Sequence, residues 1–295
     1  MIHQRTGLLK YGFVGPALVV LIVLNIFPLL YNVVLSFTDA DLVGGGARYV
    51  GGANYSKVFS TPDYVAAIRT TAVFVAVAVS VELCLGFCLA LALHRGFRGK
   101  GAILTILLIP MMLSPAVMAL FWHQILSGDY GILNQVLGAA GLGQPEWLTA
   151  PGLKLISILM IDVWMWTPFM MLIALAGLNS IPQYIYEAAE VDRAGAWRTF
   201  RRITLPMCAP LLVLAVLLRT TDALKQFDLV MAATGPNDAA TQTLSALMFQ
   251  KVFGDGKTGL GSAYACVVLV LVIALASVFT RYIDFIQRKQ GKIQP

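Results

Sequence analysis

Six long apolar stretches constrain what this chain can fold into more than any other feature. They cover residues 12–37, 71–93, 103–126, 155–178, 205–224 and 263–279. A helix needs about 20 apolar residues to cross the hydrocarbon core of a bilayer. Of the 295 residues, 58% are hydrophobic and only 12% are charged, whereas soluble domains carry about 25% charged residues. The sequence therefore predicts an all-α, polytopic membrane protein with six transmembrane helices, built as a single domain over residues 1–295.

The first apolar stretch and the cysteines are both interpreted as structural. The stretch is longer than the core of a secretory signal, and no small-residue cleavage site follows it, so we expect a retained helix. The four cysteines lie in apolar stretches without a CxxC pair, which is typical of packing residues. The three histidines, at positions 3, 94 and 123, form no HExxH motif. The sequence thus predicts no metal site and no catalytic residue.

The basic residues are distributed unevenly along the chain. Of the 21 Lys and Arg residues, 13 fall in residues 1–11, 94–102, 179–204 and 280–295. The opposite segments are longer in total but contain fewer basic residues. Cytoplasmic loops of membrane proteins are enriched in Lys and Arg, so both termini are predicted to be cytoplasmic. The net charge of +6 therefore reflects membrane topology, and we expect contact with membrane lipid but no nucleic-acid partner.

Proline and glycine mark breaks at two places in the predicted helices. Pro110 and Pro115 lie within the third apolar stretch, which predicts a kinked helix there. In the inside loop of residues 181–206, Pro182 suits the first turn of a helix, and Gly195 is a natural break or C-cap. This loop is therefore predicted to form a helix-turn-helix at the membrane surface, followed directly by the fifth span.

The first helix of this loop is predicted to be two-faced. At 100° per residue, Ala188 and Ala189 fall on one side, and Glu187 and Glu190 fall on the other. A helix that only floated on the bilayer would hold its acidic residues against an anionic leaflet, which is unfavourable. We therefore favour docking against another protein over docking on lipid.

The same loop resembles the EAA loop of ABC importer permeases. That loop has a Glu-Ala-Ala sequence, a Gly four residues after the second Ala, and an Ile-x-Leu-Pro sequence near its end. The matches at the family spacing are Glu187, Ala188, Ala189, Ile203, Leu205 and Pro206. The position of the family Gly is occupied by Arg193, and a Gly follows two places later at Gly195. Asp192 matches the pattern of the carbohydrate-permease branch of the family.

The resemblance implies a transport subunit rather than an enzyme. The loop of residues 181–206 would dock in a cleft of a cytoplasmic ATPase, with Glu187 facing a cationic side chain. This chain has no GxxxxGK[ST] motif, so ATP and Mg²⁺ would be bound by that partner. The implied assembly, in a prokaryotic inner or plasma membrane, contains two ATPase copies, a second homologous permease, expected to be a distinct chain, and an extracytoplasmic sugar-binding protein.

Polar residues within the predicted spans are candidates for substrate binding, because they are costly to place in hydrocarbon. By their distance from the loop, the resemblance to maltose-importer permeases implies that a sugar site is lined by Asp162, Trp166, Arg219, Asp222 and Gln226. Hydroxyl groups would bond to the polar groups, and the sugar would stack on the aromatic ring. An internal ion pair of Arg219 with Asp162 or Asp222 is the alternative. Glu82 in the second span is expected to bond to a neighbouring helix.

Two other functions remain open from the sequence. A permease of the same class could carry a non-sugar solute such as a phosphate ester, an amino acid or a metal ion. A secondary transporter with its own driving-ion site would show inverted repeats or pairs of broken helices, and neither is recognisable in the sequence. The leading interpretation is the permease subunit of an ABC importer for a di- or oligosaccharide.

Overall fold

A computed structural model describes residues 14–44 and 46–291 of the chain. The basic segment 1–11 and the first two residues of the first predicted span lie outside the described residues, as do residues 292–295. Apart from one isolated bridge between Thr38 and Tyr49, the described residues contain only helices and loops, which confirms the all-α prediction. They divide into two compact units, residues 14–64 with 248–269 and residues 65–247 with 270–291. The single-domain assignment stays a prediction.

Five continuous helices are long and apolar enough to cross a membrane. They cover Val14–Ser36, which includes η1 (Ile22–Ile26) and α2 (Phe27–Ser36), Pro62–His94 (α4), Pro151–Asn179 (α8), Ala196–Ala223 and Thr258–Phe285 within α14 (Thr258–Gly291). They match the first, second, fourth, fifth and sixth predicted stretches. The fourth of them joins α10 (Ala196–Thr199), η3 (Phe200–Thr204) and α11 (Leu205–Ala223) without interruption.

The third predicted span, residues 103–126, is not one helix. It consists of α5 (Lys100–Leu108), the 3₁₀ turn η2 (Pro110–Met112) and α6 (Pro115–Ile125). Pro110 cannot donate to the helical ladder, and Ser114 is extended because it precedes Pro115. The predicted kink is therefore a complete break. Among the described residues, five continuous helices are long and apolar enough to cross a membrane, and the six spans stay a prediction.

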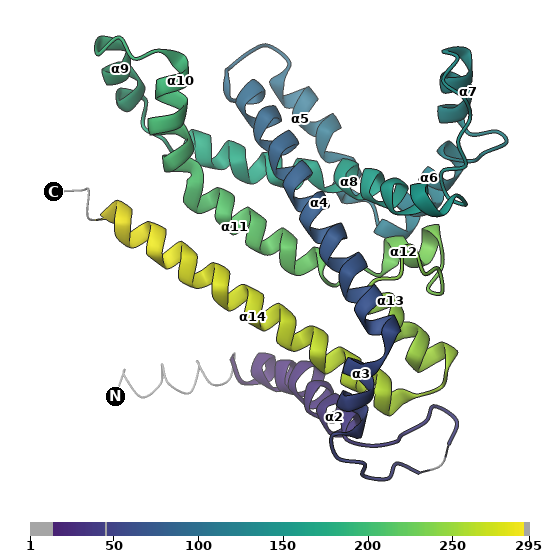
Figure 1. Cartoon of the computed structure of the whole chain (residues 1–295). Helices are drawn as coiled ribbons and strands as arrows, with labels where there is room; N and C mark the ends of the chain where they lie inside the picture. Colours follow the sequence, from purple (N-terminus) through teal and green to yellow (C-terminus); the bar gives the residue numbers. More distant parts are fainter. Residues whose placement is uncertain (1–13, 45, 292–295) are drawn as a thin grey trace, which may run out of the picture. The chain divides into compact units, whose positions relative to one another are not determined.

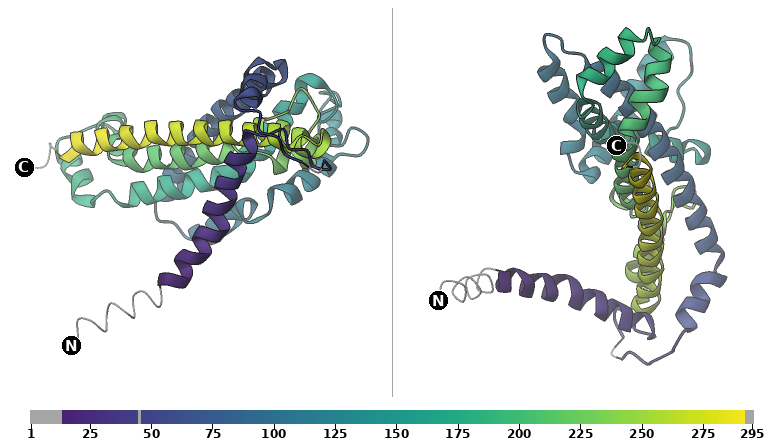
Figure 2. Two further views of the ribbon diagram at one scale, coloured as in Figure 1. Left: turned by 90° about the horizontal axis from the view of Figure 1, so that it is seen from below. Right: turned by 90° about the vertical axis from the view of Figure 1, so that its left-hand side faces the viewer.

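The shorter helices lie in the connections between these elements. They are α3 (Ala53–Ser60), α7 (Ile132–Ala139), α9 (Gln183–Val191), α12 (Asp228–Ala233), α13 (Leu244–Phe249) and η4 (Gln250–Gly254). In the first unit, the helix Val14–Ser36 forms one continuous rod, seen in purple in Figure 2. Its end is fixed by the buried Asn54 of α3, whose amide nitrogen donates to the carbonyl oxygens of Ser36 at 3.0 Å and Thr38 at 2.7 Å.

The second unit is built around α8, and Figure 1 shows its connection through α9 and α10 to α11. In the most apolar segment of α8, 56% of the residues are buried within the structure, which is the largest share among the five long helices. One core cluster includes Phe74, Ile158 and Ala215, from α4, α8 and α11. A second cluster, towards the loop, includes Ala90 and Leu178. α4 and α11 thus both pack against α8, which positions the polar residues of all three helices.

Gly86 allows α4 to approach α8 closely. A Cβ atom at this position would lie 2.6 Å from the Cβ of Met170 and 2.8 Å from the backbone nitrogen of Met171. Real Cβ atoms do not come so close to backbone, so any side chain would push the two helices apart. Small residues serve this purpose between membrane helices, where close packing replaces the hydrophobic effect as the driving force.

We predict that Gly86→Ala lowers the stability of the purified protein by about 1–3 kcal/mol, the usual cost of overpacking. Gly101→Ala in α5 is the matched control, because a Cβ there has no neighbour within 4 Å. Thermal unfolding in detergent should show a lower Tm for the first variant alone. Equal Tm values for both variants would contradict the close contact.

Candidate functional site

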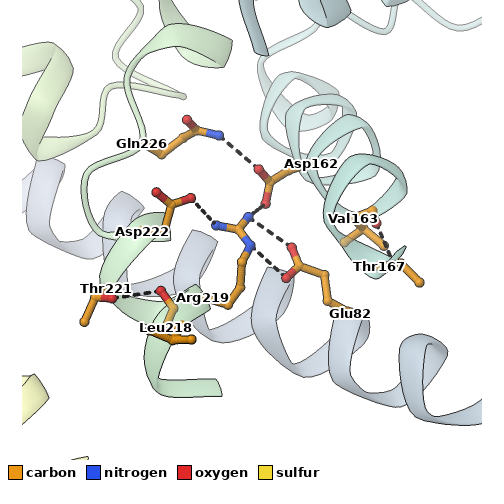
Figure 3. A network of polar contacts seen from close by, with 9 residues as sticks. All are labelled: Glu82, Asp162, Val163, Thr167, Leu218, Arg219, Thr221, Asp222 and Gln226. Carbon is orange, nitrogen blue, oxygen red and sulfur yellow. Dashed lines mark hydrogen bonds and ion pairs between the residues drawn. The ribbon is translucent and has the colours of Figure 1, made fainter. Parts of the chain in front are cut away.

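All five predicted substrate residues meet in one network within the second unit: Figure 3 shows Asp162, Arg219, Asp222 and Gln226, and the ring of Trp166 lies over the guanidinium of Arg219. Asp162 and Trp166 come from α8, Arg219 and Asp222 come from the end of α11, and Gln226 follows in the turn after it. Glu82 of α4 joins them. The network therefore connects three long helices at one level.

The guanidinium of Arg219 is the centre of this network. Its Nε donates to Oε2 of Glu82 at 2.9 Å and its Nη2 to Oε1 at 3.1 Å, which makes a bidentate pair. Nη2 also donates to Asp162, and Nη1 donates to Asp222 at 3.3 Å. The ring of Trp166 covers the guanidinium, with 5.0 Å between the ring centroid and Cζ. This cation is therefore held by three carboxylates and an aromatic face.

Gln226 extends the network beyond the helices. Its Nε2 donates to Oδ1 of Asp162 at 2.9 Å. Its backbone carbonyl accepts a hydrogen bond from Oγ1 of Thr243 at 2.8 Å, which anchors the turn after α11 to the residue before α13. Both oxygens of the Asp162 carboxylate therefore have partners.

The network has a buried inner part and a more open outer part. Arg219 is 1% exposed, and Glu82 and Asp162 are fully buried. The side chain of Asp222 is 53% exposed, while Trp166 and Gln226 are partly buried. The internal ion pair considered from the sequence is thus observed for Asp162 and Arg219. Contact of the outer residues with a sugar stays a prediction.

Glu82 belongs to the network, but it was not among the substrate-binding residues predicted from the sequence. The sequence prediction that it bonds to a neighbouring helix is confirmed by its pair with Arg219 of α11. A lone carboxylate in an apolar stretch indicated a partner, but no sequence spacing shows which helix supplies it.

The second candidate site is the hairpin of α9 and α10, which Figures 1 and 2 show side by side at the end of α8. Helix α9 ends in a Schellman motif. The backbone nitrogen of Ala194 donates to the carbonyl of Ala189, and that of Arg193 to the carbonyl of Glu190, both at 2.9 Å. Arg193 has a φ of 54°, the one positive φ found outside glycine in residues 14–44 and 46–291. Arginine thus adopts the backbone conformation that favours glycine.

The predicted break at Gly195 is confirmed, because this residue lies between α9 and α10, but Gly195 is not the C-cap of α9. Gly195 has a φ of −65° and is the N-cap of α10, so it does not need the freedom of glycine. The turn is made two residues earlier, at Arg193, because the chain must reverse directly after α9 ends at Val191. Asp192 is the exposed C-cap of α9.

The two alanines share one face of α9, as predicted, but they differ in exposure. Ala189 is 7% exposed, whereas Ala188 is exposed together with Glu187. Both alanines line a groove of about 340 Å³, with Arg198 and Arg202 on its other side. The hairpin therefore offers a small-residue groove with an acidic side chain beside it. Of the other predicted loop residues, Ile203 is partly buried, and Leu205 and Pro206 are exposed.

Two long helices connect the candidate sites. Asp162 lies 17 residues before the end of α8 at Asn179, which corresponds to about 25 Å along a helix axis. Helix α11 runs from Leu205, after the hairpin, to the network at Arg219. A displacement of the hairpin would therefore be transmitted to the network by helices that pack against each other.

The chain is similar to known transport proteins over most of its length. Residues 82–289 match the family described as binding-protein-dependent transport system inner membrane component. The trehalose/maltose transport system permease protein MalF of Thermococcus litoralis is 34% identical over 280 residues, 95% of each chain. The trehalose transport system permease protein SugA of Mycobacterium tuberculosis is 31% identical over 287 residues, 95% of this chain and 92% of the other.

The fold has also been observed in a solved structure. The match is a chain from the crystal structure of a bacterial ABC transporter involved in the import of the acidic polysaccharide alginate. The two chains superpose with a TM-score of 0.85 at 20% identity, over 95% of this chain and 96% of the other. This likeness concerns the fold alone.

We predict that Arg219→Met destabilises the protein by about 3 kcal/mol or more, because it leaves two buried carboxylates without a cation. Asp222→Asn should change stability by less than about 0.5 kcal/mol, since the side chain is half exposed. Thermal unfolding in detergent compares the two variants. A stable Arg219→Met protein would show that the buried network does not hold α4, α8 and α11 together.

We also predict that Arg193→Gly stabilises the turn by about 1 kcal/mol, because a side chain is unfavourable at positive φ. The amides of residues 193 and 194 should then exchange hydrogen about fivefold more slowly. Arg198→Gly removes the same side chain from the interior of a helix and should have the opposite effect. Faster exchange in Arg193→Gly would mean that the arginine side chain itself stabilises the turn.

Proposed function

This chain belongs to the family of binding-protein-dependent transport system inner membrane components, and we propose that it is the permease subunit of an ATP-driven importer for a sugar. The observation that carries the proposal is the exposed hairpin of α9 and α10, which joins the two helices that contribute most of the polar network. A transport subunit needs both a contact for its energy source and a polar path within its helices. The relative that is 34% identical over 95% of both chains is named for trehalose and maltose, which supports a di- or oligosaccharide as substrate.

In this proposal, the hairpin docks on a separate ATPase that binds ATP and Mg²⁺. Glu187 is an exposed residue of α9, directly before the two alanines that line the groove, so it can meet a cationic side chain of the partner. The continuous helix from Ala196 to Ala223 would then carry the movement of the hairpin into the membrane. Two ATPase copies, one for each permease, would suit the proposed complex.

The outer part of the network is the proposed sugar contact. The carboxylate of Asp222 and the side-chain oxygen of Gln226 can accept hydrogen bonds from hydroxyl groups. Trp166 is partly exposed, and an indole can pack against a sugar ring. Asp162 and Arg219 are too deeply buried for direct contact. They position the outer residues instead.

A second permease is proposed to complete the path. In a bilayer, non-helical backbone must be covered by protein or line a polar cavity. The break between α5 and α6 interrupts the helical ladder at residues 109–114, and Met112 there is 79% exposed. A partner permease, here expected to be a distinct chain, would cover this break, and a binding protein would deliver the sugar from outside.

The proposed topology has six membrane crossings with both termini in the cytoplasm. The basic residues around the hairpin, Arg193, Arg198, Arg201 and Arg202, support an inside position for it. The broken helix α5–α6 would supply the third crossing. The membrane would be the inner or plasma membrane of a prokaryote.

We predict that Glu187→Lys abolishes sugar uptake and weakens co-purification of the ATPase, because it reverses the charge at the proposed docking groove. Insertion and stability should stay unchanged, since the side chain is exposed. Asp129→Lys, an exposed residue before α7, is the matched control. Both variants are assayed by radiolabelled trehalose and maltose uptake in cells that express the complete importer. Normal uptake by Glu187→Lys would refute the docking role, and absence of uptake by the parent importer would refute the sugar substrate.

A further inference from the structure

The charge state of the substrate can be inferred from how the network uses its single cation. Sites that bind carboxylate, sulfonate or phosphate groups usually offer a guanidinium with free donors. The side chain of Arg219 is 1% exposed, and three of its nitrogen atoms donate to carboxylates of the same chain. The ring of Trp166 covers one of its faces. Arg219 is therefore not available to bind an anionic ligand.

The groups that a ligand can reach are acceptors of hydrogen bonds. Asp222 directs one carboxylate oxygen to Arg219, and its side chain is 53% exposed. Gln226 donates one amide hydrogen to Asp162, and its side-chain oxygen can accept a hydrogen bond from a ligand. A sugar hydroxyl group can donate a hydrogen bond to the oxygen of Asp222 or to that of Gln226, whereas an ionised acid group has no proton to donate.

The charge balance around the network points in the same direction. Three carboxylates, from Glu82, Asp162 and Asp222, share the single guanidinium of Arg219, and Asp222 is the one among them that is exposed. Lys225 and Asp228, which lie close to them in the sequence, are both exposed and carry opposite charges. Lys154 is paired with Asp238. A ligand with a negative charge would therefore be repelled, and the repulsion is strongest at Asp222, the exposed carboxylate.

We propose that this network selects uncharged sugars and rejects anionic ones, with Asp222 as the residue that determines the preference. The inference rests on the proposed sugar permease function and goes beyond it by naming the substrate class. The fold itself does not decide the question, because the same fold occurs in a transporter of an acidic polysaccharide. The network also disfavours the phosphate ester that the sequence left open.

The test compares uptake of trehalose with uptake of its derivative in which one hydroxymethyl group is oxidised to a carboxylate. The complete importer, with its own binding protein and ATPase, is used for the parent chain and for Asp222→Asn. Because the binding protein is the same, a change in the ratio of the two uptake rates comes from the permease. Asp222→Asn should raise the ratio of derivative to trehalose about fivefold, the effect of one unit charge at about 4 Å in a water-like medium.

Three further variants keep the result interpretable. Asp222→Glu retains the charge and should leave the ratio unchanged, as should Asp129→Asn, an exposed carboxylate outside the network. Asp222→Ser replaces Asp222→Asn if the latter does not assemble with its partners. An unchanged ratio in the uncharged variants, with trehalose uptake intact, would overturn the charge preference and leave the sugar function standing. Lack of uptake of both sugars by the parent importer would overturn the proposed function and the inference with it.

Discussion

The contact of the Arg219 guanidinium with Glu82 and Asp162 is the interaction on which the second unit depends. All three side chains are at most 1% exposed and come from α11, α4 and α8. In a low-dielectric interior, each of these charges would be strongly unfavourable alone, and removing one partner costs far more than the pair contributes. The three helices must therefore meet at one level with the cation between the carboxylates. This requirement determines both the register of the bundle and the place of the candidate substrate site.

Helices α8 and α11 also connect the hairpin of α9 and α10 to the network. Helix α8 is the most buried of the long helices, and α11 packs along it, with Gly177 in contact with Cys208. Tightly packed interiors transmit displacement instead of absorbing it. A partner that moves the hairpin would therefore act on α8 and α11 together, and through them on Asp162 and Arg219. In the proposed importer, energy used outside the membrane would in this way change a polar site about 25 Å away.

Several features could be predicted from the sequence because they depend on local composition. Long apolar stretches identified five continuous helices, and the prolines at positions 110 and 115 indicated an irregularity in the third stretch. Other details depend on the tertiary structure. Ala188 and Ala189 line one groove, as their predicted shared face requires, but the return of the chain through α10 buries only Ala189. Gly195 lies in the predicted break between α9 and α10, whereas Arg193 adopts the positive φ that ends α9.

The sequence alone determined the class of molecule, because apolar length and charge distribution depend only on residue order. It also identified five of the six members of the network as candidates, since a polar residue in an apolar stretch is conspicuous. Only the tertiary structure decided how these residues divide into a buried ion cluster and an exposed rim. Glu82 and Arg219 are 137 residues apart, and no local pattern specifies that they meet. Their pairing follows from the packing of α4 and α11 on α8, where Gly86 allows close approach and a buried cation must find its carboxylates.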